Sequence, residues 1–396
     1  MGFDPFSLSQ RCLFFNFKAT SINLNIIEDE MLRLTAPINS LGYGVAGYNI
    51  FKELFKINSS TALYPISKPE FVDDDILQGM RNRNNKNNWT AQPSVKIWHQ
   101  NDVHTHIGKG LHVGFPIFEL TEFNEEEKMS MSHCDKLFVC SQWAKDVVMD
   151  QCPPISYRGI ELERFVDEER VHVVPLGVDV ELFQPHISKR DATIFFNCGK
   201  WEKRKGHDVL LECFNTAFEP TDNVELWMMC ENPFIGEMNQ QWVDLYKNSP
   251  MGSKIRIIPR QQTHKDVYNI MKQADCGVFP ARAEGWNLEL LEMMACGKHV
   301  IATNYSAHTE FCNKDNCHLV EINKLEEAHD GVFFSGKLGK WASYNQSAKD
   351  QLIHHLRVVH KLKSLHGCIS NPEGIKTARK FSWKNSAREL LNGLEL

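Results

Sequence analysis

The chain has 396 residues, of which 42% are hydrophobic and 24% charged, a composition typical of a folded protein with about two domains. The 44 lysines and arginines face 50 acidic residues, so the net charge is -6, and no global positive field attracts the chain to nucleic acid or to an anionic membrane. No apolar run approaches the roughly 20 residues that span a bilayer, and the start, MGFDPFSLSQRCLFF, does not resemble a secretory signal. We therefore expect a cytoplasmic protein without a transmembrane segment.

In the first half of the chain, short β-rich runs alternate with helical patterns, which is typical of βαβ units in a mostly parallel sheet. The periodicity predicts strands at 31–39, 61–66, 94–100, 112–119, 135–141 and 170–177. It predicts helices at 48–56, from Glu125 onward and from Gln142 to Met149. The polar stretch 82–88 has no apolar period and indicates an exposed loop.

A second series of strands follows a connection, PLGVDVELFQPHISKRD, that contains Pro and Gly and has no regular period. These strands are predicted at 193–199, 224–230, 254–259, 276–281 and 298–304. We place the domain boundary near 183–190 and expect the ligand in the cleft between the carboxyl ends of the two sheets. The last segment, 381–394, has a helical pattern with Ser382 as its N-cap.

The segment ARAEGWNLELLEMMACG, at 281–297, joins a strand to a helix that we expect from Leu288 to Ala295. The free N–H groups at the start of such a helix bind phosphate oxygens, and Gly285 would let the backbone approach the anion. Glu284 precedes the helix and Glu292 lies about two turns into it, so one carboxylate could hold a transferred sugar and the other a ribose. The alternative is that Glu284 caps the helix and Glu292 is solvated.

The segment CGKWEKRKGHD, at 198–208, supplies cations to the same expected sheet edge. Lys200 follows the first strand of the second half, and Lys205 comes directly before Gly206 and a helix. Two fixed positive charges at this place can neutralise a leaving diphosphate. The alternative is a solvated basic turn, which is what we expect of Lys203 and Arg204.

Two loops of the first half are further candidates. The motif G-x-G-x-x-G at 42–47 lies between a predicted strand and helix, but the acidic residue of an NAD site is missing after the next strand. The motif could instead be a plain tight turn. His99 or Asn101, after another strand, could contact an acceptor, whereas His104 and His106 are more typical of a polar rim than of a metal site.

The twelve cysteines are scattered singly and include no C-x-x-C pair, so we expect reduced, mostly buried thiols. Cys312 and Cys317, with His308 and His318 nearby, form the one candidate for structural zinc. Their segment has the pattern of an ordinary loop, so we expect no metal there.

The motifs in their order resemble the family 4 (group 1) retaining glycosyltransferases of the GT-B fold. EGWNLELLEMMACG at 284–297 is similar to that family's E-G-F-G-L-x-x-L-E-A-M-A-C-G signature. Other motifs match in the family's order: the Gly-rich turn at 39–47, D-x-L-F-V-x-S at 135–141, V-P-L-G-V-D at 174–179, G-K-x-x-x-x-K-G at 199–206 and F-S-W at 381–383.

The resemblance implies an α/β fold with two facing Rossmann-like domains. Residues 1–183 would bind the acceptor, residues 184–380 a UDP- or GDP-linked sugar, and residues 381–396 would form a helix that returns to the first domain. No metal or other cofactor is implied. The implied catalytic residues are Glu119, Lys200, Lys205 and Glu284. The implied donor-binding residues are Gly44, Gly285, Trp286, Asn287, Leu288 and Glu292.

The sequence departs from the family pattern at four positions. Asn287 and Glu289 stand where the family usually has Gly and Pro, and Lys200 stands where it most often has Arg, which replaces a bidentate fork with a point charge. Glu119, at the end of the predicted strand 112–119, stands where many members carry a His near the reacting centre. A branch of the family resembles this chain in having Phe-Glu-x-Thr there.

The leading interpretation is a retaining glycosyltransferase that acts on a glycan or another small acceptor. One alternative is an enzyme of the phage type that glycosylates a modified DNA base. Local basic clusters would serve it, at Arg81, Arg83 and Lys86 and at Arg158, Arg164 and Arg170. Another alternative is an inactive scaffold that only binds a nucleotide sugar, because a fold alone does not establish activity.

Overall fold

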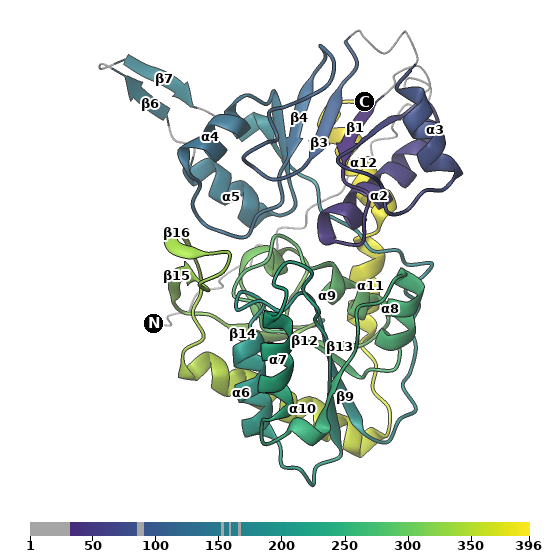
Figure 1. Cartoon of the computed structure of the whole chain (residues 1–396), viewed down its shortest axis with the longest axis vertical. Helices are drawn as coiled ribbons and strands as arrows, with labels where there is room; N and C mark the ends of the chain where they lie inside the picture. The colour runs from purple at the N-terminus through teal and green to yellow at the C-terminus, as the bar shows by residue number, and fades with distance from the viewer. Residues whose placement is uncertain (1–31, 85–90, 152–153, 158–159, 165–167) are drawn as a thin grey trace, which may run out of the picture.

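The protein is described by a computed structural model that covers residues 32–84, 91–151, 154–157, 160–164 and 168–396. The first 31 residues of the predicted 1–183 domain lie outside the described residues, as do Lys86, Arg158 and the side chain of Arg164. Two lobes face each other, one in purple and blue and one in green (Figure 1). None of the helices that the structure describes is long and apolar enough to cross a membrane.

The first lobe is built on a six-stranded parallel sheet in the order β2-β1-β3-β4-β5-β8. Its strands are β1 (Arg33–Ala36), β2 (Ala62–Pro65), β3 (Ser94–Ile97), β4 (His112–Phe115), β5 (Lys136–Val139) and β8 (Val171–Val173). Its helices are α2 (Gly42–Ile57), α3 (Asp74–Asn82), α4 (Glu125–Ser132) and α5 (Gln142–Gln151). A separate antiparallel hairpin consists of β6 (Pro154–Tyr157) and β7 (Ile160–Arg164).

The second lobe has a six-stranded parallel sheet in the order β11-β10-β9-β12-β13-β14. Its strands are β9 (Thr193–Cys198), β10 (Val224–Met229), β11 (Ile255–Ile257), β12 (Cys276–Phe279), β13 (His299–Asn304) and β14 (His318–Glu321). Its helices are α6 (His207–Ala217), α7 (Met238–Lys247), α8 (His264–Met271), α9 (Leu288–Ala295), α10 (Gln346–His366) and α11 (Pro372–Lys380). A second hairpin consists of β15 (Leu325–His329) and β16 (Ser335–Ala342).

The last helix, α12 (Trp383–Leu394), crosses from the second lobe back to the first, where it packs against α2 (Figure 1). Ser382 caps this helix, as the sequence predicts, because its side chain accepts a hydrogen bond from the Asn385 N–H. The crossing is tied to the chain between the lobes, since the Val178 N–H donates to the Phe381 carbonyl at 3.0 Å. Lys136 of β5 holds the end of the helix through the Gly393 carbonyl at 2.9 Å.

Several strands end earlier than the sequence pattern predicts, and proline is the physical reason. The predicted strand 112–119 ends at Phe115, directly before Pro116, which has no N–H to donate to the sheet. Glu119 therefore lies in the loop after β4 and not at the end of the strand. The strand predicted at 276–281 likewise ends at Phe279, before Pro280.

The expected Gly-rich loop at 39–47 is mostly helix, which corrects the prediction that the helix begins at Tyr48. Helix α2 begins at Gly42, and Gly44 and Gly47 are both buried within it. A side chain at Gly47 would meet the Pro37 carbonyl oxygen at 2.4 Å. These glycines let the helix lie directly against the connection from β1, so close packing explains them.

We predict that Gly44→Ala lowers the free energy of unfolding by about 1 to 3 kcal/mol, the usual range for overpacking. A Cβ at this position would lie 2.1 Å from Oδ1 of Asn39 and 2.4 Å from its backbone nitrogen. Gly42→Ala is the matched control, since nothing lies within 4 Å of a Cβ there. Urea unfolding measures both variants, and equal stability would contradict the packing role of Gly44.

Candidate functional site

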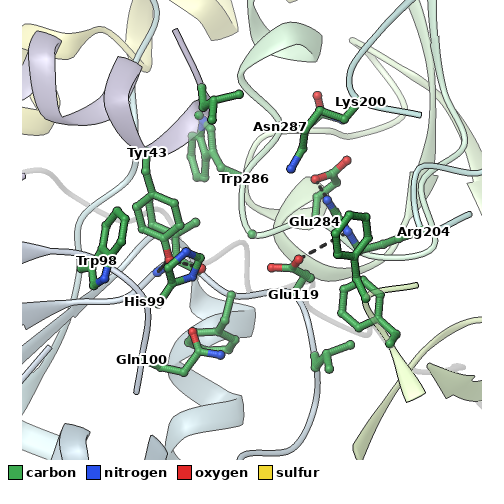
Figure 2. A pocket seen from close by; sticks show the side chains of 18 of the residues that line it. Tyr43, Trp98, His99, Gln100, Glu119, Lys200, Arg204, Glu284, Trp286 and Asn287 are labelled. Atoms are coloured by element: carbon green, nitrogen blue, oxygen red, sulfur yellow. Dashed lines mark hydrogen bonds and ion pairs between the residues drawn. The ribbon is translucent and has the colours of Figure 1, made fainter. Parts of the chain in front are cut away.

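A cavity of about 620 Å³ lies between the two lobes, at the carboxyl ends of both sheets. The loops after β1, β3 and β4 line it from the first lobe, and those after β9 and β12 line it from the second. In Figure 2, Tyr43, Trp98 and His99 form one group, and Glu119, Arg204 and Glu284 form another. The cleft in which the sequence predicts the ligand site therefore contains a cavity.

Arg204 is the centre of a buried ionic network on the second-lobe side (Figure 2). Its guanidinium contacts three carboxylates: Glu284 at 2.9 Å, Glu202 at 2.9 Å and Glu119 at 3.3 Å. The expectation that Arg204 is a solvated residue is therefore wrong, because its side chain is only 8% exposed. Lys203 beside it is partly exposed, and Arg282 takes its backbone carbonyl as an acceptor.

Glu284 is held by two cations. Lys205 Nζ lies 2.8 Å from Oε1, and a guanidinium nitrogen of Arg204 lies 2.9 Å from Oε2. Burial alone would raise the pKa of the Glu284 carboxyl, but Lys205 and Arg204 outweigh it and lower the pKa to about 2. Burial by itself would lower the pKa of Lys205, whereas Glu284 raises it above the ordinary value. Both groups are charged at neutral pH.

Lys200 lies at the outer edge of the same network. Its Nζ is 3.2 Å from Glu202, and the side chain is 35% exposed, unlike those of Arg204 and Lys205. It also lies over the Phe234 ring, 5.1 Å from the centroid. Lys200 is thus the most accessible of the three cations that line this part of the cavity.

Asn287 lies directly before α9, where the family usually has Gly, and its backbone conformation shows why Asn can replace Gly there. Its φ is 84°, in the left-handed region where Gly is easiest and Asn is among the few tolerated alternatives. Its side chain caps α9 by accepting from the Leu290 N–H, and its amide nitrogen lies 2.9 Å from Nε2 of His308. Asn287 therefore makes the helix start, and Glu284 is not its cap.

Gly285 is required by the approach of the two lobes. A Cβ on it would lie 2.7 Å from Cγ2 of Ile117 and 3.0 Å from the Phe118 carbonyl oxygen. The next residue, Trp286, is buried against Phe311, with ring centroids 4.9 Å apart. The segment of Gly285 to Leu288 thus lines the cavity while it touches the loop that carries Glu119.

A smaller cavity of about 130 Å³ adjoins the main one, and Leu41, Lys200 and Leu288 line both. Glu292 lines only the smaller cavity and is 9% exposed. Burial, with Glu289 and Asp179 nearby, raises the pKa of its carboxyl well above the ordinary value. No partner for this carboxyl occurs among the described residues, so it is open to hydroxyl donors from a ligand.

Arg260 marks the far end of this smaller cavity and was not singled out from the sequence. Its guanidinium donates to the Ser40 hydroxyl of the first lobe, and its backbone N–H donates to Glu231. No motif identifies it, because it lies after the edge strand β11, in a segment without a family signature. The order of the strands in the sheet places Arg260 and Glu292 in the lining of the same cavity.

On the first-lobe side, Tyr43 holds the loop that carries Glu119. Its hydroxyl donates to the Ile117 carbonyl at 2.6 Å and accepts the Ile117 N–H at 3.1 Å. The surrounding protein raises the pKa of Glu119, which the Arg204 charge opposes. The His99 ring lies 4.7 Å from that of Tyr43, and partial burial, with Lys200 nearby, lowers the pKa of its imidazole.

The structure does not bring every candidate to the cavity. Gly44 is buried inside α2 and does not line it, whereas Gly42 does. Asn101 is exposed and outside the lining, where Gln100 takes its place. His104 contacts the Ser130 hydroxyl and His106 stacks on His112, away from His99.

Cys312 and Cys317, with His308 and His318 nearby, are the candidates for a metal site in the sequence. Among the described residues, no group of three or more His, Cys, Asp or Glu side chains is placed to hold a metal ion. Cys312 and Cys317 are both buried free thiols.

Part of the second lobe resembles a known protein family. Residues 179–332 match the model of the family described as Glycosyl transferases group 1. A relative from Catenulispora acidiphila, D-inositol 3-phosphate glycosyltransferase 1, is 27% identical over 150 residues. That match covers 34% of this chain and 35% of the relative, so the chain spans about a third of the length of this relative.

Solved structures resemble the chain over nearly its whole length. Sucrose-phosphate synthase from Thermosynechococcus elongatus aligns with 92% of this chain and 98% of its own, at a TM-score of 0.64 and 12% identity. The Anabaena protein HepE in complex with UDP aligns with 92% and 99%, at a TM-score of 0.63 and 12% identity. At this identity the likeness concerns the fold alone, and it confirms the GT-B fold.

We predict that Glu284 makes the wild-type protein more sensitive to acid than the Glu284→Gln variant. The folded-state pKa of about 2 lies below the ordinary value of 4.5, so this carboxylate stabilises the fold above pH 4.5. That stability is lost as the pH falls from 4.5 toward 2, by roughly 3 kcal/mol. Urea unfolding between pH 7 and pH 2 measures the difference.

The expected profiles converge at low pH, because Glu284→Gln never carries the charge. The control is Glu125→Gln, since the Glu125 side chain is 93% exposed and should follow the wild type throughout. Parallel profiles for the wild type and Glu284→Gln would show that the carboxylate is not stabilised in the fold.

Proposed function

We propose that the chain, whose residues 179–332 belong to the group 1 glycosyltransferases, transfers a glycosyl group from a nucleoside diphosphate sugar to an acceptor hydroxyl, with retention of configuration. The acceptor would lie against the first lobe and the donor against the second. The observation that carries the proposal is the Glu284, Arg204 and Lys205 network, which lies beside the start of α9 in the cavity between the lobes.

The cations would act on the diphosphate. Lys200 is accessible, and Lys205 is held in place by its ion pair with Glu284. A preorganised cation stabilises the charge that develops on a leaving diphosphate without a cost of reorganisation during the reaction. We propose that these side chains, with the N–H groups at the start of α9, supply this charge without a metal ion or other cofactor.

Donor binding would change the partners of Glu284. Arg204 and Lys205 both contact Glu284, so a diphosphate would compete with Glu284 for Lys205. A carboxylate that loses part of its ionic contact can accept hydrogen bonds from sugar hydroxyls. Glu284 would therefore position the transferred sugar next to the bond that breaks.

The nucleoside part of the donor fits the adjoining smaller cavity. Glu292 has no partner among the described residues and could accept bonds from the ribose hydroxyls. Arg260 and the loop after β11 would then lie near the base. UDP and GDP are both candidates, and the HepE complex makes UDP the first to test.

The two alternatives have no observation in their favour. The hypothesis of a modified DNA base as acceptor depends on basic clusters that include Arg83 and Arg170. Arg83 donates to the Met80 carbonyl and Arg170 to the Asp135 carbonyl, so both side chains bind their own lobe. For the scaffold alternative, Glu284, Glu292, Lys200 and Lys205 all line one or both of the two cavities, where a donor could reach them. Only the hypothesis of an active enzyme gives all four residues a role.

We predict that the wild type slowly hydrolyses one sugar nucleotide from a panel of UDP- and GDP-sugars, and that Lys205→Met lowers its turnover by about 10² or more. Met keeps the length of the side chain but removes the charge that contacts Glu284. Lys203→Met is the matched control, because this neighbour does not line the cavity. Release of UDP or GDP is the measurement.

Binding without any hydrolysis would support the scaffold alternative, and equal rates for both variants would remove Lys205 from the reaction.

Proton NMR of the first transfer product shows the configuration of its anomeric carbon. An inverted product would refute the retaining part of the proposal alone.

We predict that Glu119→Gln keeps the affinity for the donor but lowers the rate of transfer sharply. Gln has the size of Glu and can still lie against Arg204, yet it cannot stabilise a positively charged sugar in the transition state. Isothermal titration with UDP measures binding, and initial rates measure transfer. Glu126→Gln, on the exposed side of α4, is the control.

Normal transfer by Glu119→Gln would exclude Glu119 from the reaction. His99 would then be the next residue to substitute, because it is the other sequence candidate that lines the first-lobe side of the cavity.

A further inference from the structure

The β15–β16 hairpin extends from the second lobe toward the first (Figure 1). Phe333, Phe334 and Leu338 of this hairpin line the main cavity. Its β16 strand touches the first lobe, where the Lys340 N–H donates to the Thr121 hydroxyl at 2.9 Å. The hairpin therefore forms part of the cavity wall and contacts both lobes.

The base of the hairpin is fixed to the segment that carries Glu284. Arg282 contacts Glu326 of β15 at 3.2 Å, and its other nitrogens hold Asp208 at 2.8 and 2.9 Å. The Arg282 carbonyl accepts the Ala342 N–H at 2.9 Å. Since Arg282 is two residues from Glu284, the hairpin and the donor network share one rigid support.

The tip of the hairpin is also held in one conformation. Oδ1 of Asp330 accepts the N–H groups of Val332, Phe333 and Phe334, each at 2.8 Å. Gly331 has a φ of 74°, which this turn requires. Phe333 is nevertheless 46% exposed, so the tip holds an aromatic ring at the cavity rim where the protein alone does not cover it.

The lining of the cavity divides by chemistry. Its described cations, Lys200, Arg204 and Lys205, all belong to the loop after β9, on the donor side. Beside Thr121, which the hairpin contacts, the lining is acidic and aromatic, with Glu122 and Phe123. Glu127 also lines the cavity, but its two oxygens already accept from Gln100 and from the Asn124 N–H. Lys337 and Lys340 of β16 are exposed and do not line the cavity.

We propose that the β15–β16 hairpin selects the acceptor, and that the acceptor is a sugar without a phosphate group. Phe333 and Phe334 cover the apolar face of its ring, while Glu122 accepts bonds from its hydroxyls. This inference rests on the proposed function and names the substrate class of the same cavity.

A phosphorylated acceptor fits this lining poorly. Its phosphate would be brought out of water beside carboxylates, without a free cation on the acceptor side among the described lining residues. Arg204 and Lys205 are already in contact with carboxylates and would be needed for the donor. The hydroxyls of an uncharged sugar instead suit carboxylate acceptors.

The test uses the full chain and the sugar nucleotide that the wild type hydrolyses fastest. The acceptor probes are methyl glycosides of glucose, galactose, mannose and N-acetylglucosamine, each paired with its 6-phosphate. The readout is the ratio of transfer to hydrolysis. Phe333→Ser is compared with Val332→Ser, because both positions are 46% exposed at the same tip and only Phe333 lines the cavity.

We expect transfer to at least one unphosphorylated glycoside and at most weak transfer to its phosphate. Phe333→Ser should lower the ratio for this glycoside by about three- to tenfold, the scale of one aromatic contact, while Val332→Ser should match the wild type. Preference for a phosphorylated probe, an unchanged ratio for Phe333→Ser, or no transfer to any unphosphorylated probe would each overturn the inference.

The hydrolysis rate separates the two proposals. If the wild type hydrolyses no sugar nucleotide, the proposed function itself fails. If hydrolysis proceeds but Phe333 has no effect on transfer, the function stands and only the role of the hairpin is refuted.

Discussion

A buried carboxylate that needs two cations is the constraint on which the site depends. Removing Glu284 from water is costly unless its charge is paired, and Arg204 and Lys205 supply the pairing from the loop after β9. The loops after β9 and β12 are therefore locked together. Because Arg204 also contacts Glu119, the same network reaches the first lobe and fixes the width of the cleft. The ion pairs of Glu284 and Arg204 thus set the relative positions of the loops that form the site.

The sequence was sufficient to predict the residues whose position follows from local rules. The helix α9 runs from Leu288 to Ala295 as expected, and Ser382 caps α12, because periodicity and capping act over a few residues. Asn287 also follows a local rule, because its left-handed φ is one that Asn tolerates where Gly is usual. The alternation of strands and helices likewise predicts two parallel sheets, because it depends only on order along the chain.

The residues that sequence reasoning misjudged are those whose surroundings come from distant parts of the chain. In Lys203-Arg204-Lys205, nothing in the local sequence shows that Arg204 and Lys205 join the ionic network while Lys203 does not. The path of the loop decides, and it bends at Gly206, whose φ is 74° and whose missing Cβ leaves room for the Pro280 carbonyl. Gly44 was misjudged for the opposite reason: a motif suggested a ligand, while tertiary packing against Asn39 explains the glycine.

The charge balance of the cavity connects donor binding to the choice of acceptor in the proposed function. Lys200, Arg204 and Lys205 carry three positive charges, and Glu119, Glu202 and Glu284 carry three negative ones when ionised, so the network by itself has no surplus positive charge for a second anion. A donor diphosphate gains these cations only by loosening their carboxylates, which then turn to sugar hydroxyls. A phosphate on the acceptor would compete for the same cations and oppose that exchange. An uncharged acceptor does not compete for these cations, so that only the donor diphosphate replaces their carboxylate partners. The hairpin that would cover this acceptor is tied by Arg282 to the segment of Glu284.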